Sequence, residues 1–216
     1  MSVDFQASLF GSLDTDPATD TQVGVGPLAG RVQRTTLGHG AWIDVLPGWF
    51  AGADAVFADL VAAVPWRAER RQMYDAVVDV PRLVHTYGIA EALPHPALVE
   101  ARDALSAHYA PELGEPFVTA GCCYYRDGRD SVAWHGDDLG RGRTQDTMVA
   151  IVSFGSPRKL QLRPVGGSVA VSHALGHGDL VVMGGSCQRT WEHAVPKTAR
   201  PVGPRISVQF RPRNVF

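Results

Sequence analysis

The chain has 216 residues, 45% of them hydrophobic and with a formal net charge of −2, which suits one domain with a sizeable core and argues neither for nor against an anionic partner. No apolar run is long enough to span a bilayer, and the N-terminus lacks the basic-then-apolar order of a signal peptide, so we expect a cytoplasmic protein. The three cysteines include no Cys-x-x-Cys pair, which disfavours a disulfide framework and a zinc knuckle.

Residues 1–35 are predicted to form a flexible tail ahead of a single domain at residues 36–216. Asp, Thr, Gly and Pro dominate residues 12–30, and no hydrophobic period is visible there. Within the tail, the run Gln6-Ala7-Ser8-Leu9-Phe10 resembles the bacterial sliding-clamp-binding pentapeptide, in which a Leu-Phe pair fills an apolar pocket. A sliding clamp is therefore one candidate partner. The alternative is a hydrophobic anchor that folds back on the domain.

Two amphipathic helices are predicted in the first half of the domain, after a strand at residues 41–46. Residues 53–64 and residues 94–109 both carry apolar side chains at helical spacing, and prolines open the second segment. The two apolar stripes are Val56, Phe57, Leu60, Val61 and Val64 in the first helix, and Leu98, Ala101, Leu105 and Tyr109 in the second.

The segment between the helices is rich in arginine. We expect Arg67, Glu69, Arg70 and Arg71 to lie on a solvated turn, with contact to phosphate groups as the alternative. The following residues 77–87 are predicted to be extended, with a break at Pro81 because proline cannot donate to a strand ladder.

From residue 117 onward the sequence changes to short apolar segments separated by turn signals. Many short strands at regular spacing are typical of a β-sandwich or barrel, and two helices ahead of them predict an α+β domain in which the helices back one sheet. No Gly-rich nucleotide-binding motif is present. The predicted strands are residues 117–125, 130–135, 147–154, 159–163, 168–172, 179–183, 188–194 and 205–211.

A candidate metal site centres on the run Trp134-His135-Gly136-Asp137-Asp138. His135 and Asp137 are two residues apart, so on an extended strand both side chains point to the same side. His193 lies on a later predicted strand and is the best third ligand. Two His and one carboxylate on one face of a metal form the facial triad of non-haem Fe(II) oxygenases.

Arg205 and Arg211 form a candidate anion site. They are six residues apart on one predicted strand and therefore project to the same face. Guanidinium groups bind carboxylates through paired hydrogen bonds, so the two arginines suit a dicarboxylate cofactor, to which Tyr125 can add a hydroxyl group. The alternative is a pair of salt bridges to acidic residues on neighbouring strands.

Together these segments resemble an AlkB-type Fe(II)/2-oxoglutarate dioxygenase over residues 36–214. The order of the segments is more specific than any one of them. They are Pro81-Arg82 with Thr86-Tyr87-Gly88, Tyr125-Arg126-Asp127-Gly128-x-Asp130, the His-x-Asp-Asp run, Ser153-Phe154-Gly155 with Arg158, Gly178-Asp179-Leu180-Val181-Val182-Met183-Gly184-Gly185, Trp191-x-His193, and Arg205 with Arg211.

The resemblance implies a double-stranded β-helix, or jelly-roll barrel, and a set of residue roles. His135, Asp137 and His193 are expected to hold Fe(II), and Tyr125, Arg205 and Arg211 to hold 2-oxoglutarate, with O2 as co-substrate. Asp138 is expected to read the exocyclic nitrogen of a substrate base. The implied reaction is oxidative demethylation of N-alkylated bases in DNA, presented single-stranded or flipped out of the duplex. The arginines that could hold phosphates during this step are Arg67, Arg70, Arg71, Arg129, Arg141, Arg143 and Arg158.

The chain departs from the family pattern at Cys123, Ser207 and Gln209, where the family usually has Asn, Asn and Thr. These changes bear on cofactor affinity rather than on reaction type. The segment after Gly88 is also short, so the aromatic side chain that stacks on the base is not identified, and Tyr74, His85 and Tyr87 are candidates that equally suit core packing.

Two alternatives stay open at this point. The same oxygenase chemistry can act on RNA, on a protein side chain or on a small molecule, because the iron site is shared among such enzymes. A non-catalytic protein that binds nucleic acid or a clamp through a degenerate barrel is the other alternative.

Overall fold

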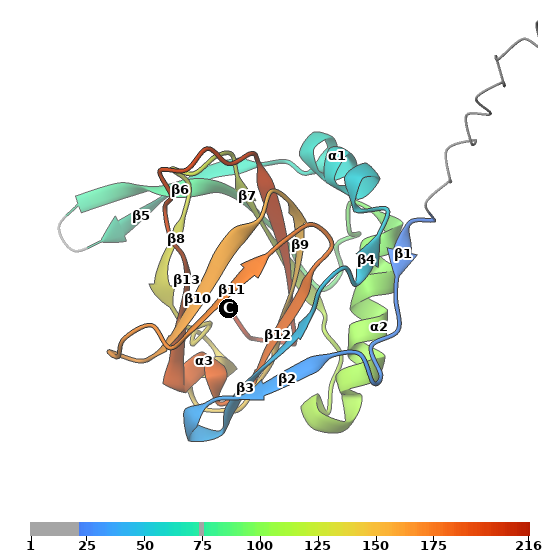
Figure 1. Cartoon of the computed structure of the whole chain (residues 1–216), viewed down its shortest axis with the longest axis vertical. Coiled ribbons are helices and arrows are strands. Elements are labelled where there is room, and N and C mark those ends of the chain that lie inside the picture. The colour runs from blue at the N-terminus through green and yellow to red at the C-terminus, as the bar shows by residue number, and fades with distance from the viewer. Residues whose placement is uncertain (1–21, 74–75) are drawn as a thin grey trace, which may run out of the picture.

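The structure is a computed structural model that describes residues 22–73 and 76–216, and over residues 70–73 and 76–79 it describes the backbone alone. Its elements follow one another along the chain as coloured in Figure 1. They are β1 (Gly24–Val25), β2 (Gln33–Thr36), β3 (Ala41–Leu46), β4 (Phe50–Ala51), α1 (Ala53–Ala63), β5 (Arg67–Met73), β6 (Ala76–Tyr87), α2 (Pro96–Leu113), β7 (Thr119–Tyr125), β8 (Val132–His135), β9 (Val149–Gly155), β10 (Arg158–Pro164), β11 (Val171–Leu175), β12 (Leu180–Gly185), α3 (Cys187–Thr190), β13 (Trp191–Val195) and β14 (Arg205–Arg211).

Two antiparallel sheets form the body of the domain. The larger has the strand order β2-β3-β12-β9-β14-β7-β6-β5, and the smaller has the order β11-β10-β13-β8. A buried cluster that includes Ile43, Met183, Leu160 and Leu162 contains side chains from both sheets. This double-stranded β-helix confirms the predicted α+β class, because α1 and α2 lie on one side of the barrel (Figure 1).

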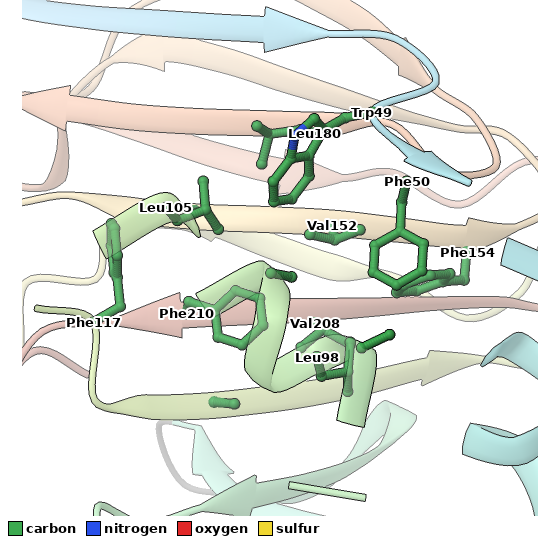
Figure 2. Packing of buried hydrophobic residues seen from close by; sticks show 14 of the residues in the cluster. Trp49, Phe50, Leu98, Leu105, Phe117, Val152, Phe154, Leu180, Val208 and Phe210 are labelled. Atoms are coloured by element: carbon green, nitrogen blue, oxygen red, sulfur yellow. The ribbon is translucent and has the colours of Figure 1, made fainter. Parts of the chain in front are cut away.

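A second apolar cluster joins the helices to the larger sheet. Leu98 and Leu105 of α2 pack with Val208 and Phe210 of β14, as Figure 2 shows. The predicted stripe on the second helix is therefore confirmed as its core face. The helix begins where the N–H of Ala97 donates to His95 Nδ1 over 3.1 Å, and it ends at Leu113, four residues beyond the predicted position. Within the described residues, no helix has the length and apolar content of a membrane span.

The predicted start of the domain at residue 36 is too late. Strand β1 pairs with β4, and β2 pairs with β3 over four residue pairs. Leu28 between them is 5% exposed and belongs to the helix-side cluster. These short strands have no local hydrophobic period, because their backbone hydrogen bonds come from strands that follow in the sequence. Residues 1–21, which include the predicted clamp-binding motif, lie outside the described residues.

The arginine-rich segment is a strand and not the predicted solvated turn. Residues 67–73 form β5, which pairs with β6 in a hairpin that projects from the barrel (Figure 1). A charged strand at the edge of a sheet is common because charge discourages pairing with other chains. The predicted break at Pro81 is also wrong. The β5 register shifts opposite Pro81, and β7 pairs with β6 only from Leu83 onward, so neither neighbour requires an N–H from the proline.

The other predicted strands are present with two changes: the strand predicted at residues 168–172 lies at Val171–Leu175, and only part of residues 188–194 is a strand. The second change concerns the start of residues 188–194. That segment starts as the one-turn helix α3, in which the N–H groups of Arg189 and Thr190 donate to the Ser186 carbonyl. Only the second part forms β13. The turn matters for the site below, because it carries Gln188.

Candidate active site

Strand β14 presents a row of polar side chains to the space between the sheets. Arg205, Ser207, Gln209 and Arg211 alternate with apolar residues that pack in the helix-side core, as strand periodicity requires. Across the β14–β7 ladder their partners are Tyr125, Cys123, Gly121 and Thr119. The row borders a cavity between the two sheets. The cavity is lined by Arg82, Cys123, Tyr125, Val132, His135, Ile151, Leu160, His193, Val195, Arg205, Ser207, Gln209 and Arg211.

The two candidate histidine ligands meet at this cavity. His135 ends β8 and pairs with His193 of β13, and their ring centroids are 4.3 Å apart. His135 Nδ1 lies 2.9 Å from the carbonyl oxygen of Ala133, which can only accept, so Nδ1 carries the proton and Nε2 keeps its lone pair. His193 is 6% exposed, and burial together with His135 lowers its pKa to about 3. Both rings therefore have a nitrogen available as a donor to a metal.

Asp137 is fixed through both its backbone and its side chain. Its N–H donates to Gln188 Oε1 over 3.0 Å, and its two carboxylate oxygens accept from Arg211 Nη2 over 3.1 and 3.2 Å. Burial opposes ionisation of this carboxyl group, but Arg211 and the two imidazoles outweigh burial and lower the pKa of Asp137 to about 2. The carboxylate is therefore an anion held beside the two imidazole rings.

The three predicted ligands are together, but their side chains are not in coordinating positions. Among the described residues, no group of three His, Cys, Asp or Glu side chains has the arrangement that holds a metal ion. Asp137 faces Arg211 instead of completing a triad with His135 and His193. The residue types still fit Fe(II), because two imidazoles and one carboxylate form a facial triad. Their assignment as ligands stays a prediction.

Arg205 is a buried cation with spare hydrogen-bonding capacity. It is 2% exposed, its Nε donates to Ser153 Oγ over 2.9 Å, and its Nη1 is buried without a partner. Its guanidinium carbon lies 5.1 Å from the centroid of the Tyr125 ring. Arg211 Nε in the same cavity also has no partner. Buried unpaired donors are costly, so these two groups fit an anionic ligand. The alternative of two salt bridges holds for Arg211, which pairs with Asp137, but among the described residues Arg205 has no such ion pair.

The three departures from the family pattern form one polar contact network in the cavity wall. Gln209 Nε2 donates to Ser207 Oγ over 2.6 Å, and Arg82 Nε donates to Cys123 Sγ over 3.4 Å. A Cβ atom on Gly121 would lie 2.8 Å from Arg211 Nη1 and 2.9 Å from Gln209 Oε1, so glycine makes room for both side chains. Sequence analysis missed the parts played by Gly121 and Arg82. A glycine within a strand was the available signal, because it often marks close approach of another group.

Several other predicted residues lie away from the cavity. Asp138 is exposed and does not line it. Tyr87 is buried in the helix-side core, as its alternative interpretation required. Arg158 was a candidate phosphate contact, and this is wrong: it is 4% exposed and bonded to backbone carbonyls. A buried arginine is uncommon, and here three backbone carbonyls satisfy its donors. The side chains of Arg70, Arg71 and Tyr74 lie outside the described residues.

The cysteines differ enough for a labelling experiment. Cys122 and Cys187 are each 2% exposed, and burial raises the pKa of both thiols, that of Cys187 to about 12. Cys123 is half-buried and lines the cavity. We expect iodoacetamide at pH 8 to alkylate Cys123 alone in the folded protein, because the thiolate is the reactive form. Peptide mass spectrometry measures which thiols are alkylated. The control is denatured protein, in which all three thiols should be labelled. Equal labelling of the three thiols in the folded protein would contradict the assigned burial.

Comparisons with known proteins agree with the arrangement of the cavity. Residues 52–211 match the family model described as the 2OG-Fe(II) oxygenase superfamily. The chain is 32% identical over 182 residues to the alpha-ketoglutarate-dependent dioxygenase alkB homolog 3 of Bos taurus, covering 74% of this chain and 61% of that protein. It is 34% identical over 134 residues to the DNA oxidative demethylase ALKBH2 of Arabidopsis thaliana, covering 51% of this chain and 42% of that protein. The chain thus spans less than two thirds of the length of either relative.

Among solved structures, the structure of OsALKBH1 has a TM-score of 0.56 at 13% identity, covering 84% of this chain and 100% of that chain. At this identity the likeness shows the fold alone. The family model covers most of the domain, and the relatives at about 30% identity are of the AlkB kind. Because the family model spans residues 52–211, the chain belongs to the 2OG-Fe(II) oxygenase superfamily, and the relatives of the AlkB kind are proteins to which it is similar.

Proposed function

We propose that the protein is an Fe(II)- and 2-oxoglutarate-dependent dioxygenase that demethylates N-alkylated bases in DNA. The observation that carries the proposal is the cavity itself, which is lined by two imidazoles, by a buried guanidinium with an unpartnered donor and by Arg211, which binds the Asp137 carboxylate. A site of this kind suits a metal and an anionic co-substrate together.

Six residues at or beside the cavity have a proposed task. His135, Asp137 and His193 would hold Fe(II), and Arg205 would bind the far carboxylate of 2-oxoglutarate through its free Nη1. Arg211 keeps Asp137 ionised and oriented. Tyr125, which is 3% exposed and lies against Arg205, closes the cavity and excludes water from the anion. The bound metal and 2-oxoglutarate, with O2, supply oxidation of a substrate C–H bond to C–OH, while 2-oxoglutarate becomes succinate and CO2.

The proposed substrate follows from the chemistry of the product. Hydroxylation of a methyl group on a base nitrogen gives a hydroxymethyl group, which breaks down to formaldehyde and the repaired base. A base must leave its stack to enter a cavity between two sheets, and this is easiest in a single strand or at a damaged pair. Two relatives named for DNA demethylation or for alkB support this substrate class. Exposed Arg67 and Arg143 are candidate phosphate contacts.

The test is a panel of oligonucleotides that carry 1-methyladenine or 3-methylcytosine. Single-stranded DNA, duplex DNA and RNA versions are incubated with Fe(II), 2-oxoglutarate and O2, and succinate and formaldehyde are measured in the same reaction. We expect formaldehyde in proportion to succinate on methylated DNA and none on the unmethylated strand. Succinate without formaldehyde would favour a protein or small-molecule substrate, and formaldehyde from RNA alone would move the substrate to RNA. No binding of 2-oxoglutarate would favour the non-catalytic alternative.

Asp138 offers a separate test of substrate recognition. Its side chain is exposed beside Asp137 but outside the cavity that would hold the co-substrate. We expect Asp138→Asn to lower formaldehyde release from methylated DNA at least about tenfold, as loss of one polar contact to a base does, while substrate-free succinate formation stays near the parent rate. An equal loss in both assays would mean that Asp138 supports Asp137 instead of reading the base.

A further inference from the structure

A buried guanidinium that the proposed chemistry does not use lies behind the cavity. Arg158 begins β10 and is 4% exposed. Its Nη1 donates to the Asp127 carbonyl over 3.0 Å, and its Nη2 donates to the carbonyls of Asp130 and Pro196 over 2.8 and 2.7 Å. The nearby Asp130 carboxylate is bonded to Arg126 instead, through the backbone N–H and the guanidinium. Arg158 therefore uses its planar fork to bind main chain.

The three carbonyls come from the two segments that flank the imidazole strands. Asp127 and Asp130 lie in the turn that leads into β8, whose last residue is His135. Pro196 directly follows β13, which carries His193. The turn and the loop also touch without Arg158, since the Thr198 N–H donates to the Gly128 carbonyl over 2.8 Å and a Cβ on Gly128 would clash with the Thr198 carbonyl. One guanidinium thus joins the start of β8 to the end of β13.

The pairing between β8 and β13 is irregular, so a contact outside the ladder is needed to hold the two strands in place. His193 pairs with His135 and Val195 pairs with Val132, but the register shifts between the two pairs. A register shift interrupts the ladder and leaves residues without their regular partners. On its other side β13 is paired regularly with β10, the strand that Arg158 begins. Beyond the shift, one ladder pair, Val195 with Val132, and contacts outside the ladder set the position of β8 relative to β13.

Arg158 also lies beside the proposed anion site. Its guanidinium carbon is 5.7 Å from the centroid of the Tyr125 ring, and that of Arg205 is 5.1 Å from the same centroid. The two like charges act on each other, and this repulsion adds to burial in lowering the pKa of Arg205. A second cation at this end of the cavity favours an anion there.

We infer that Arg158 is a positioning residue of the active site, which fixes the two imidazole strands relative to each other by tying the turn before β8 to the loop after β13. The inference rests on the proposed function, because the imidazoles need this alignment only if they share a metal. Groups that orient metal ligands typically change metal affinity about 10–100-fold when they are removed.

The experiment measures metal binding by the metal-free protein. Arg158→Gln and Arg158→Lys are compared with the parent for Co(II) affinity, for the visible Co(II) spectrum and for 2-oxoglutarate affinity in the presence of Co(II). We expect Arg158→Gln to weaken Co(II) binding about tenfold or more and to change the spectrum. Arg158→Lys should recover part of the affinity, since an ammonium keeps the charge but lacks the fork.

Arg163→Gln is the matched control. Arg163 lies on the same strand, but its Nε donates to Glu192 over 2.8 Å and its guanidinium stacks on Trp134, away from the cavity lining. We expect this variant to bind Co(II) and 2-oxoglutarate as the parent does. An effect as large as that of Arg158→Gln would show a general loss of sheet stability and would overturn the inference.

The outcomes separate the two proposals. If the parent binds neither Co(II) nor 2-oxoglutarate, the proposed function fails and the inference fails with it. If the parent binds both and Arg158→Gln binds both equally well with an unchanged spectrum, the inference alone fails. If Arg158→Gln does not fold, Arg158→Lys decides, and parent-like affinity and spectrum in that variant would overturn the inference.

Discussion

Replacing His193 with alanine is expected to abolish the formation of succinate from 2-oxoglutarate. His193 is 6% exposed at the cavity, paired with His135 and neutral because burial lowers its pKa to about 3. Without it, the site keeps one imidazole and one carboxylate, and a metal loses a third of its protein ligands. Loss of a group that only orients a ligand costs about 10–100-fold, so loss of the ligand itself should exceed that range.

The measurement has two parts. Succinate is followed at saturating Fe(II) and 2-oxoglutarate, and the metal retained after dialysis is measured on the same samples. His108→Ala is the matched control, because His108 lies on α2 against the Tyr109 ring and outside the cavity lining. We expect the control to keep both metal and turnover. Turnover by His193→Ala within a few-fold of the parent rate would remove His193 from the ligand set.

The second large effect is expected at Arg205, where stability and binding should change in opposite directions. Arg205 is a buried cation whose Nη1 has no partner, and its direct hydrogen bond is to the neutral Ser153 hydroxyl group. Replacing a buried charge by an apolar side chain of similar volume is often neutral or stabilising, by about 1–4 kcal/mol. We therefore expect Arg205→Met to have an equal or higher Tm than the parent when no 2-oxoglutarate is present.

The same variant should lose its co-substrate. Removing one partner of a buried charge pair costs about 2–5 kcal/mol, so the Kd for 2-oxoglutarate should rise about thirtyfold or more. Titration calorimetry with Co(II)-loaded protein measures the Kd, and thermal melts with and without 2-oxoglutarate measure the Tm. Arg205→Lys is the control that keeps the charge but lacks the planar fork. Its Kd for 2-oxoglutarate should lie between those of the parent and of Arg205→Met. A lower Tm with an unchanged Kd would make Arg205 a structural cation.

The β5–β6 hairpin was predicted wrongly from the sequence, and the error has a physical reason. The run from Arg67 to Arg71 has no apolar period, so nothing local distinguishes a solvated turn from an edge strand. Its partner is β6, and the pairing passes Pro81 only because the register of β5 shifts at that point. A register shift depends on two strands together and cannot be detected in either one alone.

Arg158 illustrates the same limit for the site. Arg158 was a candidate phosphate contact, yet three carbonyls from two other segments bind it in the interior. Gln188 and Gly121 were missed for a similar reason. The Gln188 side chain positions Asp137, because its Oε1 accepts a hydrogen bond from the Asp137 N–H, and the two residues are far apart in the sequence.

By itself the sequence determined which side chains share a face of a helix or a strand, because that depends only on local periodicity. Helical spacing placed Leu98 and Leu105 on the core face of α2, and the two-residue period of a strand placed Arg205 and Arg211 on one face of β14. Only the tertiary structure decided which strands pair and which charges are neutralised. The meeting of His135 with His193, the ion pair of Asp137 with Arg211 and the free Nη1 of Arg205 all result from contacts between distant segments, which no local period encodes.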